Sequence, residues 1–220
     1  MVSLQHNYHE LNRLQKWQYW LLLRRQLSAE DRFFFEGHRP LPGQMYLEER
    51  KVLHATILSR KPRYCYEIGT ASGGGSTFFI ASAFRALGTG KLVSLEAMKA
   101  MSERAARRYD TDLKHLRPYV EFLAGTSPNS FLPYIHDADG SVECVFLDGS
   151  DSPDETVGQY EFFLPFARKG TILMAHDWND VKMSLLRPVI EKERSWRLMT
   201  ALDEPLSVGF MVYRFEEVPA

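Results

Sequence analysis

Short apolar segments alternate with helix-like segments along most of the chain after residue 63. This alternation is typical of a mostly parallel sheet that helices cover on both faces. The last two apolar segments have no helix between them, so we expect an antiparallel pair at one edge of the sheet. The expected strands are 64–68, 91–96, 120–124, 142–147, 171–175, 196–201 and 208–215, and the expected helices between them are 76–87, 99–116, 129–135, 155–168 and 181–192.

The first 45 residues follow a different pattern. Apolar residues recur at helical spacing over residues 4–27, Ser28 can cap a second short helix, and residues 37–43 are rich in glycine and proline. A further helix is expected over residues 46–59. We therefore predict an N-terminal helical arm, residues 1–45, followed by one α/β domain, residues 46–220.

Composition narrows the classes of partner. The chain of 220 residues is 45% hydrophobic and 25% charged, which is ordinary for a folded globular protein. Its formal net charge of -1 predicts that it binds neither nucleic acid nor an anionic membrane surface. Cys65 and Cys144 lie in apolar segments and are expected to be buried, reduced thiols. The apolar stretch 17–23 is too short to span a bilayer and does not resemble a secretory signal, so we expect a cytoplasmic protein.

A glycine-rich loop follows the first expected strand. Residues 69–75 contain Gly69, Gly73, Gly74 and Gly75, which allow sharp turns and close approach to a ligand. The next helix would point its amino end, which favours anionic groups, at the same place. Such a loop alone also suits a generic tight turn or a dinucleotide site. A phosphate loop of the nucleotide-hydrolase type is excluded because no Gly-Lys-Ser/Thr follows.

Polar residues end the later strands at the same edge. Glu96 closes the second strand, where a carboxylate can accept hydrogen bonds from the two hydroxyls of a ribose. Asp148 and Asp177 each stand where an apolar strand stops, and such a charge must be paired or ligand-bound if the site excludes water. The carboxyl ends of parallel strands meet at one edge of the sheet. We therefore expect a ligand site that combines these carboxylates with the glycine loop.

Together these residues resemble the class I S-adenosylmethionine-dependent methyltransferases. The similarity is greatest to the small O-methyltransferases, which include catechol O-methyltransferase and antibiotic-sugar methylases, and it runs from about residue 46 to residue 214. It implies a Rossmann-like, doubly wound sheet of seven strands, mostly parallel with one antiparallel edge strand. The segments that carry it are 67–73, Glu96, 125–127, 146–149 and 168–177.

The resemblance also implies roles for individual residues. S-adenosylmethionine would be the methyl donor, and the acceptor would be a small hydroxylated molecule such as a sugar or a phenol. Asp148 would lie beside the methyl group and the acceptor. The cofactor would contact Gly69, Thr70, Ala71, Ser72, Gly73 and Ser76 with its methionine part, Glu96 with its ribose, and Thr126 and Ser127 with its adenine, while Glu67 anchors the glycine loop.

In the metal-dependent branch of the family, the positions of Asp148, His176 and Asp177 hold a divalent ion. Mg²⁺ prefers oxygen ligands, which suits the two aspartates, whereas His176 suits a softer ion. The chain departs from the catechol-type pattern, which has Asp-Asn at positions 176 and 177 and a catalytic lysine where this chain has Asp151. Without a metal, His176 is the first candidate for the general base and Asp151 the second. A purely structural histidine and a solvated loop acid remain the alternatives.

Two other functions are compatible with the same sheet. A nicotinamide-dependent oxidoreductase should carry Gly-x-Gly-x-x-Gly, but Ala71 stands at the place of the middle glycine. A member that binds the cofactor without turnover is the other alternative, because the family's lysine is missing. The aromatic residues of the arm make a homodimer plausible.

Overall fold

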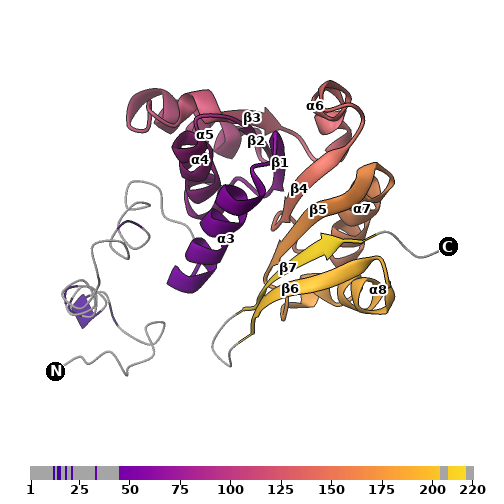
Figure 1. Cartoon of the computed structure of the whole chain (residues 1–220). Coiled ribbons are helices and arrows are strands. Elements are labelled where there is room, and N and C mark those ends of the chain that lie inside the picture. Colours follow the sequence, from indigo (N-terminus) through magenta and orange to yellow (C-terminus); the bar gives the residue numbers. More distant parts are fainter. Residues whose placement is uncertain are drawn as a thin grey trace. The chain divides into compact units, whose positions relative to one another are not determined.

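The structure is a computed structural model (Figure 1). It describes residues 45–203 and 208–216, together with Asn12, Leu14, Gln15, Gln18, Leu21 and Phe33. The chain divides into two compact units, Met1–Arg39 and Pro40–Ala220, and everything below concerns the second. The helices expected over residues 4–27 and after Ser28 lie almost wholly outside the described residues, so the predicted arm and its boundary at residue 45 stay predictions.

The elements of the second unit follow the predicted order (Figure 1). The strands are β1 (Tyr64–Ile68), β2 (Lys91–Glu96), β3 (Val120–Ala124), β4 (Val142–Leu147), β5 (Ala167–His176), β6 (Trp196–Leu202) and β7 (Phe210–Phe215). The α-helices are α3 (Leu47–Arg60), α4 (Gly75–Leu87), α5 (Lys99–Thr111), α6 (Leu132–Asp137), α7 (Pro153–Phe163) and α8 (Leu186–Lys192). Short 3₁₀ turns are η2 (Arg117–Tyr119), η3 (Pro128–Phe131), η4 (Leu164–Phe166) and η5 (Val181–Met183).

The strands form one seven-stranded sheet in the order β3-β2-β1-β4-β5-β7-β6. The first five strands pair in parallel, and β7 is antiparallel to both of its neighbours. The predicted fold class is therefore confirmed. The antiparallel strand β7 lies one position in from the edge, because the chain returns from β6 and inserts β7 between β6 and β5.

Helices cover both faces of this sheet. Tyr66 and Ile68 of β1 belong to a buried apolar cluster with Ile135 of α6, Tyr160 of α7 and Ile190 of α8. Successive side chains of a strand point to opposite faces. Glu67 of β1 accordingly faces the other layer, where α4 lies, and His176 of β5 faces α3 there. The face of the sheet to which a strand side chain points therefore decides which helices it can contact.

Prolines explain two differences from the predicted helix bounds. The helix expected to run to residue 168 ends at Phe163, because Pro165 has no N–H to continue the hydrogen-bond ladder. The helix expected to start at residue 181 begins at Leu186, which places Pro188 in the first turn, where a missing N–H is tolerated. Helix α5 likewise ends at Thr111, short of residue 116.

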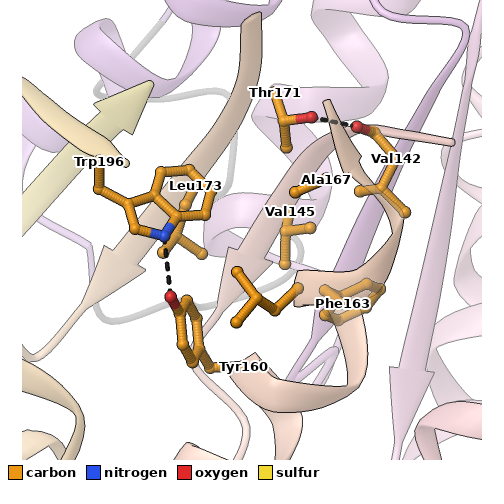
Figure 2. Close-up of a pocket in the computed structure, with 9 residues that line it drawn as sticks. Val142, Val145, Tyr160, Phe163, Ala167, Thr171, Leu173 and Trp196 are labelled. Atoms are coloured by element: carbon orange, nitrogen blue, oxygen red, sulfur yellow. Dashed lines mark hydrogen bonds between the residues drawn. The ribbon is translucent and has the colours of Figure 1, made fainter. Parts of the chain in front are cut away.

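An apolar pocket lies toward the amino ends of β4 and β5 (Figure 2). Its walls include Val142 and Ala167, the first residues of these strands. The ring N–H of Trp196 donates to the hydroxyl of Tyr160 at 2.8 Å inside it. Because it lies at the end of the sheet opposite to the strand-end carboxylates, we interpret it as a packing defect of the core.

Of the helices that the structure describes, none has the length and apolar character that a membrane crossing requires.

Two glycines let the ends of β1 and β4 approach closely. A Cβ atom on Gly69 would lie 2.6 Å from the carbonyl oxygen of Asp148, and Gly69 has a φ of +107°. A Cβ atom on Gly149 would lie 2.4 Å from Cγ2 of Ile68. Both contacts are shorter than real Cβ atoms allow, so larger residues would push the two loops apart. β1 and β4 are adjacent at the point where the strand order reverses, which is where such sheets bind ligands.

We predict that Gly69→Ala destabilises the protein by about 1–3 kcal/mol, because the added methyl group overlaps backbone that cannot move away. Gly158→Ala is the matched control, since Gly158 lies exposed in α7 with nothing within 4 Å of an added Cβ. The control should be neutral or stabilising by up to about 1 kcal/mol. Urea unfolding measures both; an equal response of the two variants would contradict the close packing.

Candidate active site

The loop after β1 is held in a strained, glycine-dependent path. Gly69, Gly73 and Gly75 have positive φ, and so does Ala71 at 46°. The N–H of Gly73 donates to the carbonyl of Thr70 at 2.8 Å, and the hydroxyl of Tyr109 donates to the carbonyl of Gly73 at 2.8 Å. The loop therefore has one defined shape at the mouth of the sheet.

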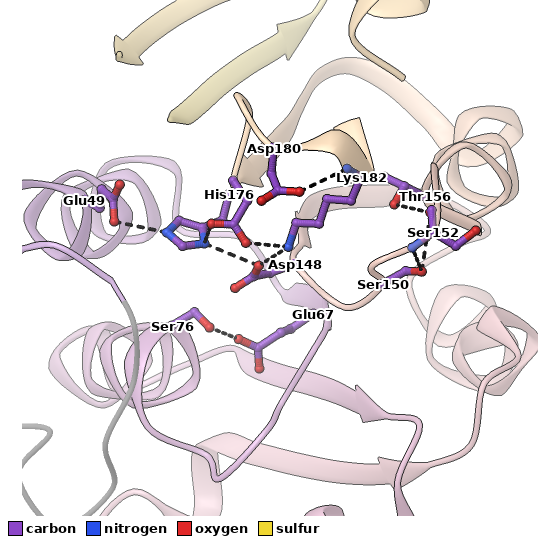
Figure 3. Close-up of polar contacts among 11 residues, drawn as sticks. Glu49, Glu67, Ser76, Asp148, Ser150, Ser152, Thr156, His176, Asp180 and Lys182 are labelled. Atoms are coloured by element: carbon purple, nitrogen blue, oxygen red, sulfur yellow. Dashed lines mark hydrogen bonds and ion pairs between the residues drawn. The ribbon is translucent and has the colours of Figure 1, made fainter. Parts of the chain in front are cut away.

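Glu67 anchors this loop from below. Its side chain is fully buried and accepts hydrogen bonds from Ser76 at 2.5 Å, Thr77 at 2.8 Å and Ser94 at 2.5 Å. Burial raises the pKa of Glu67 to about 7, although these three hydroxyl groups oppose the rise. The contact ties β1 to α4 and β2. It also engages the one hydroxyl proton of Ser76 with Glu67, so the donor that Ser76 can still offer a cofactor is its backbone N–H (Figure 3).

Glu96 lies beside the loop, as its predicted role requires. Its carboxylate accepts from the N–H of Ala71 at 2.8 Å and from the N–H of Met98 at 3.0 Å. The N–H of Gly125 donates to the carbonyl of Glu96 at 2.9 Å, which brings the loop after β3 alongside. Thr126 and Ser127 are exposed in that loop, and Ser127 caps η3 through the N–H of Asn129. Ser72 is half-buried in the glycine loop.

The loops after β1 to β5 form one edge of the sheet, which we call the rim. A cluster of buried and half-buried charged side chains lies on the side of the rim away from Glu96 (Figure 3). Nζ of Lys182 lies 2.8 Å from Oδ1 of Asp148 and 2.6 Å from Oδ2 of Asp177. Nδ1 of His176 lies 3.3 Å from Oδ1 of Asp148 and 3.1 Å from Oδ1 of Asp177, and its Nε2 lies 3.1 Å from Oε2 of Glu49. Three carboxylates thus surround two cations. Arg50, which is buried next to Glu49 and interacts with it electrostatically, adds a third positive charge and balances the three carboxylates.

His176 is held as an imidazolium. The residue is 2% exposed, and both ring nitrogens face carboxylates, so both must donate. Burial opposes the charge, but the hydrogen bonds that His176 donates to Asp148, Asp177 and Glu49 outweigh it and raise the pKa of His176 to about 12. A base must be unprotonated near neutral pH. This geometry therefore argues against His176 as the general base.

The donor set at the strand ends is poorly suited to a divalent ion. Asp148, His176 and Asp177 do offer three ligand atoms within 4.8 Å of one another. A metal, however, binds histidine through an unprotonated nitrogen, and both nitrogens of His176 serve carboxylates. The ammonium of Lys182 already contacts both aspartates. The residues as arranged do not fit a metal ion.

The two candidate catalytic aspartates, Asp148 and Asp151, lie in different surroundings. Oδ1 of Asp148 accepts from both cations, and within the described part of the chain its Oδ2 forms no hydrogen bond. Its side chain is 21% exposed, so Oδ2 can accept from a ligand. Asp151 is exposed before α7, whose first turn is capped by Ser152 through the N–H of Glu155. Asp151 lies outside the cluster.

Comparison with known proteins decides the family. A family profile described as a methyltransferase domain matches residues 66–178, which is half of the chain. The chain belongs to this methyltransferase family. The match covers the loops after β1 to β4 and the first two residues after β5, and the predicted enzyme class is confirmed. None of the curated proteins matches the chain.

Solved structures share the fold of this methyltransferase at low identity. The O-methyltransferase TomG of Streptomyces achromogenes, which is involved in tomaymycin synthesis and was solved with SAM, is 20% identical with a TM-score of 0.63, over 94% of this chain and 100% of that one. An O-methyltransferase of Bacillus cereus solved with SAH is 18% identical with a TM-score of 0.63, over 96% and 100%. The SAH-bound methyltransferase PaMTH1 of Podospora anserina is 14% identical with a TM-score of 0.62, over 94% and 97%.

Sequence reasoning missed two residues of the cluster in this methyltransferase. Lys182 stands in η5, six residues after β5 ends, where a lysine usually suggests a solvated surface. Glu49 lies on α3, before the first strand and outside the matched segment. The sequence did contain one signal that the loop His176–Lys182 is buried, namely Trp178, because a surface loop does not need a tryptophan. In the structure Trp178 is buried.

We predict that His176 stays doubly protonated at pH 8–9. Its pKa is raised above the ordinary value, so the imidazolium persists below the folded-state pKa and is lost only as the pH rises through it. Nitrogen-15 NMR of labelled histidine measures the ring protonation directly. His54 and His115, whose pKa values are lowered by burial, should be neutral in the same spectrum. A neutral His176 at pH 8 would return it to the role of base.

Proposed function

We propose that this chain is an S-adenosylmethionine-dependent O-methyltransferase that acts on a small hydroxylated molecule. The observation that carries the proposal is the convergence of the loops after β1, β2, β3, β4 and β5 at one rim, beside the charged cluster that contains Asp148. The family match and the fold shared with O-methyltransferases solved with SAM or SAH support it.

The rim suits each part of the cofactor. The backbone of 69–73, with the N–H of Ser76, would hold the methionine part. Each oxygen of Glu96 has a lone pair beyond its present hydrogen bond and can accept from a ribose hydroxyl. Thr126 and Ser127, exposed beside Glu96, would flank the adenine.

Charge gives a further reason. A sulfonium is a cation, and the carboxylate of Asp148, whose Oδ2 forms no hydrogen bond in the described part of the chain, can attract it to the rim. The half-buried position of Asp148 weakens screening by water, which strengthens this attraction.

The residues then orient the acceptor and take its proton. When bound, S-adenosylmethionine supplies an electrophilic methyl group, so that an acceptor oxygen bonds to carbon while the carbon–sulfur bond breaks and its electron pair stays on sulfur. Oδ2 of Asp148 accepts the hydrogen bond of the acceptor hydroxyl and directs its oxygen to the methyl group. The proton leaves to this carboxylate or, at the open end of the loop, to Asp151. The positive charges of His176 and Lys182 favour the oxygen anion that forms.

The acceptor class is a sugar, a phenol or a similar natural product, with no role for nucleic acid. The proposed setting is the cytoplasm, and the proposed assembly is a homodimer. A nicotinamide-dependent oxidoreductase finds no support in the family match.

We predict that S-adenosylhomocysteine binds one per chain in calorimetry and that NAD does not bind. Glu96→Ala should weaken binding about 10- to 100-fold, because it removes hydrogen bonds to a charged acceptor. Glu191→Ala, an exposed residue of α8, is the control and should bind like the wild type. Binding that ignores Glu96 would overturn the ribose assignment.

We predict that Asp148→Asn lowers methyl transfer about 100-fold or more while S-adenosylhomocysteine affinity changes little, since the amide cannot take the proton. Asp151→Asn is measured in the same way, and the variant with the larger loss of methyl transfer identifies which of the two carboxylates takes the proton. Transfer of labelled methyl groups to a panel of phenols and sugars is the assay. If no acceptor of any class becomes labelled, the chain binds the cofactor without turnover.

A further inference from the structure

Lys182 lies between two aspartates that the family resemblance assigns to a divalent ion. Its Nζ bridges Oδ1 of Asp148 at 2.8 Å and Oδ2 of Asp177 at 2.6 Å (Figure 3). These two aspartates are the oxygen ligands that sequence reasoning assigned to Mg²⁺. The residue that contacts both of them is therefore a cation of the protein itself.

We propose that the ammonium of Lys182 takes the place of the divalent ion and makes this site independent of metal. The inference rests on the proposed methyltransferase function and deepens it, because it concerns the same site. Lys182 is a positioning residue: it holds Asp148 and Asp177 in fixed places and supplies a permanent positive charge beside the acceptor oxygen.

The ammonium competes with a metal ion for the same two oxygens. Mg²⁺ binds oxygen at about 2.0–2.1 Å and requires near-octahedral geometry, so an ion bound to Oδ1 of Asp148 and Oδ2 of Asp177 would compete with Nζ for them. His176 adds to the competition, because its Nδ1 lies 3.3 Å from Oδ1 of Asp148 and 3.1 Å from Oδ1 of Asp177. A divalent ion at these oxygens would have to displace the ammonium and share both carboxylates with Nδ1.

The backbone holds Lys182 in this place. The N–H of Trp178 donates to the carbonyl of Gly209 at 3.0 Å, and the N–H of Asn179 donates to the carbonyl of Val208 at 2.9 Å, which fixes the loop to the start of β7. The carboxylate of Asp180 caps η5 by accepting from the N–H of Lys182. Lys182 is 5% exposed. An ammonium buried to this degree is stable only with its partners, so it does not leave the aspartates at little cost.

Manganese binding tests the proposal without relying on methyl transfer. In titrations followed by electron paramagnetic resonance, the wild-type chain should bind no stoichiometric Mn²⁺. Lys182→Met keeps the length of the side chain and removes its charge, so it should bind one Mn²⁺ at least about tenfold more tightly than the wild type. The double variant with Asp177→Asn should lose this gain. Lys192→Met, an exposed residue of α8, should behave as the wild type.

Two results would overturn the proposal. One is stoichiometric Mn²⁺ binding by the wild type that Asp177→Asn abolishes, and the other is a folded Lys182→Met variant that gains no Mn²⁺ site. Lys182→Arg keeps the charge and should bind no Mn²⁺. If Lys182→Met does not fold, the absence of Mn²⁺ binding by Lys182→Arg and by the wild type is the test. Binding of S-adenosylhomocysteine, measured on the same samples, reports the proposed function separately. A chain without cofactor affinity would refute that function and leave the manganese result readable.

Discussion

The contact between the buried imidazolium of His176 and the carboxylates around it holds the rim together. Glu49 comes from α3, Asp148 from the end of β4 and Asp177 from the turn after β5, so one side chain joins three separate parts of the fold. Burying charges costs free energy unless each has partners in good geometry. The cluster therefore forms only when α3 is docked and both strands are in register, and it makes the shape of the site depend on the whole fold.

The glycine packing at Gly69 and Gly149 supplies the other half of the arrangement. It brings the glycine loop against Asp148 at the point where the strand order reverses. One side of the rim is then backbone and hydroxyl groups around Glu67 and Glu96, which suits a neutral or zwitterionic ligand. The other side is the charged cluster, in which Oδ2 of Asp148 can still accept a hydrogen bond. A ligand with an adenosyl end and a cationic sulfur matches both sides, and its reactive carbon faces the charged side.

Much of this was predictable from the sequence. Buried parallel strands appear as apolar segments, so β1 to β5 and their end loops could be located, and with them Gly69, Glu96, Asp148 and Asp177. The helix ends were predicted less well, because Pro165 and Pro188 act on the hydrogen-bond ladder in ways that apolar periodicity does not reveal. Glu49 could not be predicted as a partner of His176, nor Lys182 as a partner of Asp148 and Asp177. Their pairing across 127 residues, in the case of Glu49, is a property of the tertiary structure, and a lysine in a turn gives no local sign of burial.

A crystal structure grown with S-adenosylhomocysteine and Mn²⁺, with anomalous data collected for manganese, tests the central claim most directly. The account predicts sulfur beside Asp148, ribose hydroxyls on Glu96, and Nζ of Lys182 between Asp148 and Asp177 without an anomalous peak. A ligand bound away from this rim, or manganese between the two aspartates with Lys182 turned aside, would contradict it.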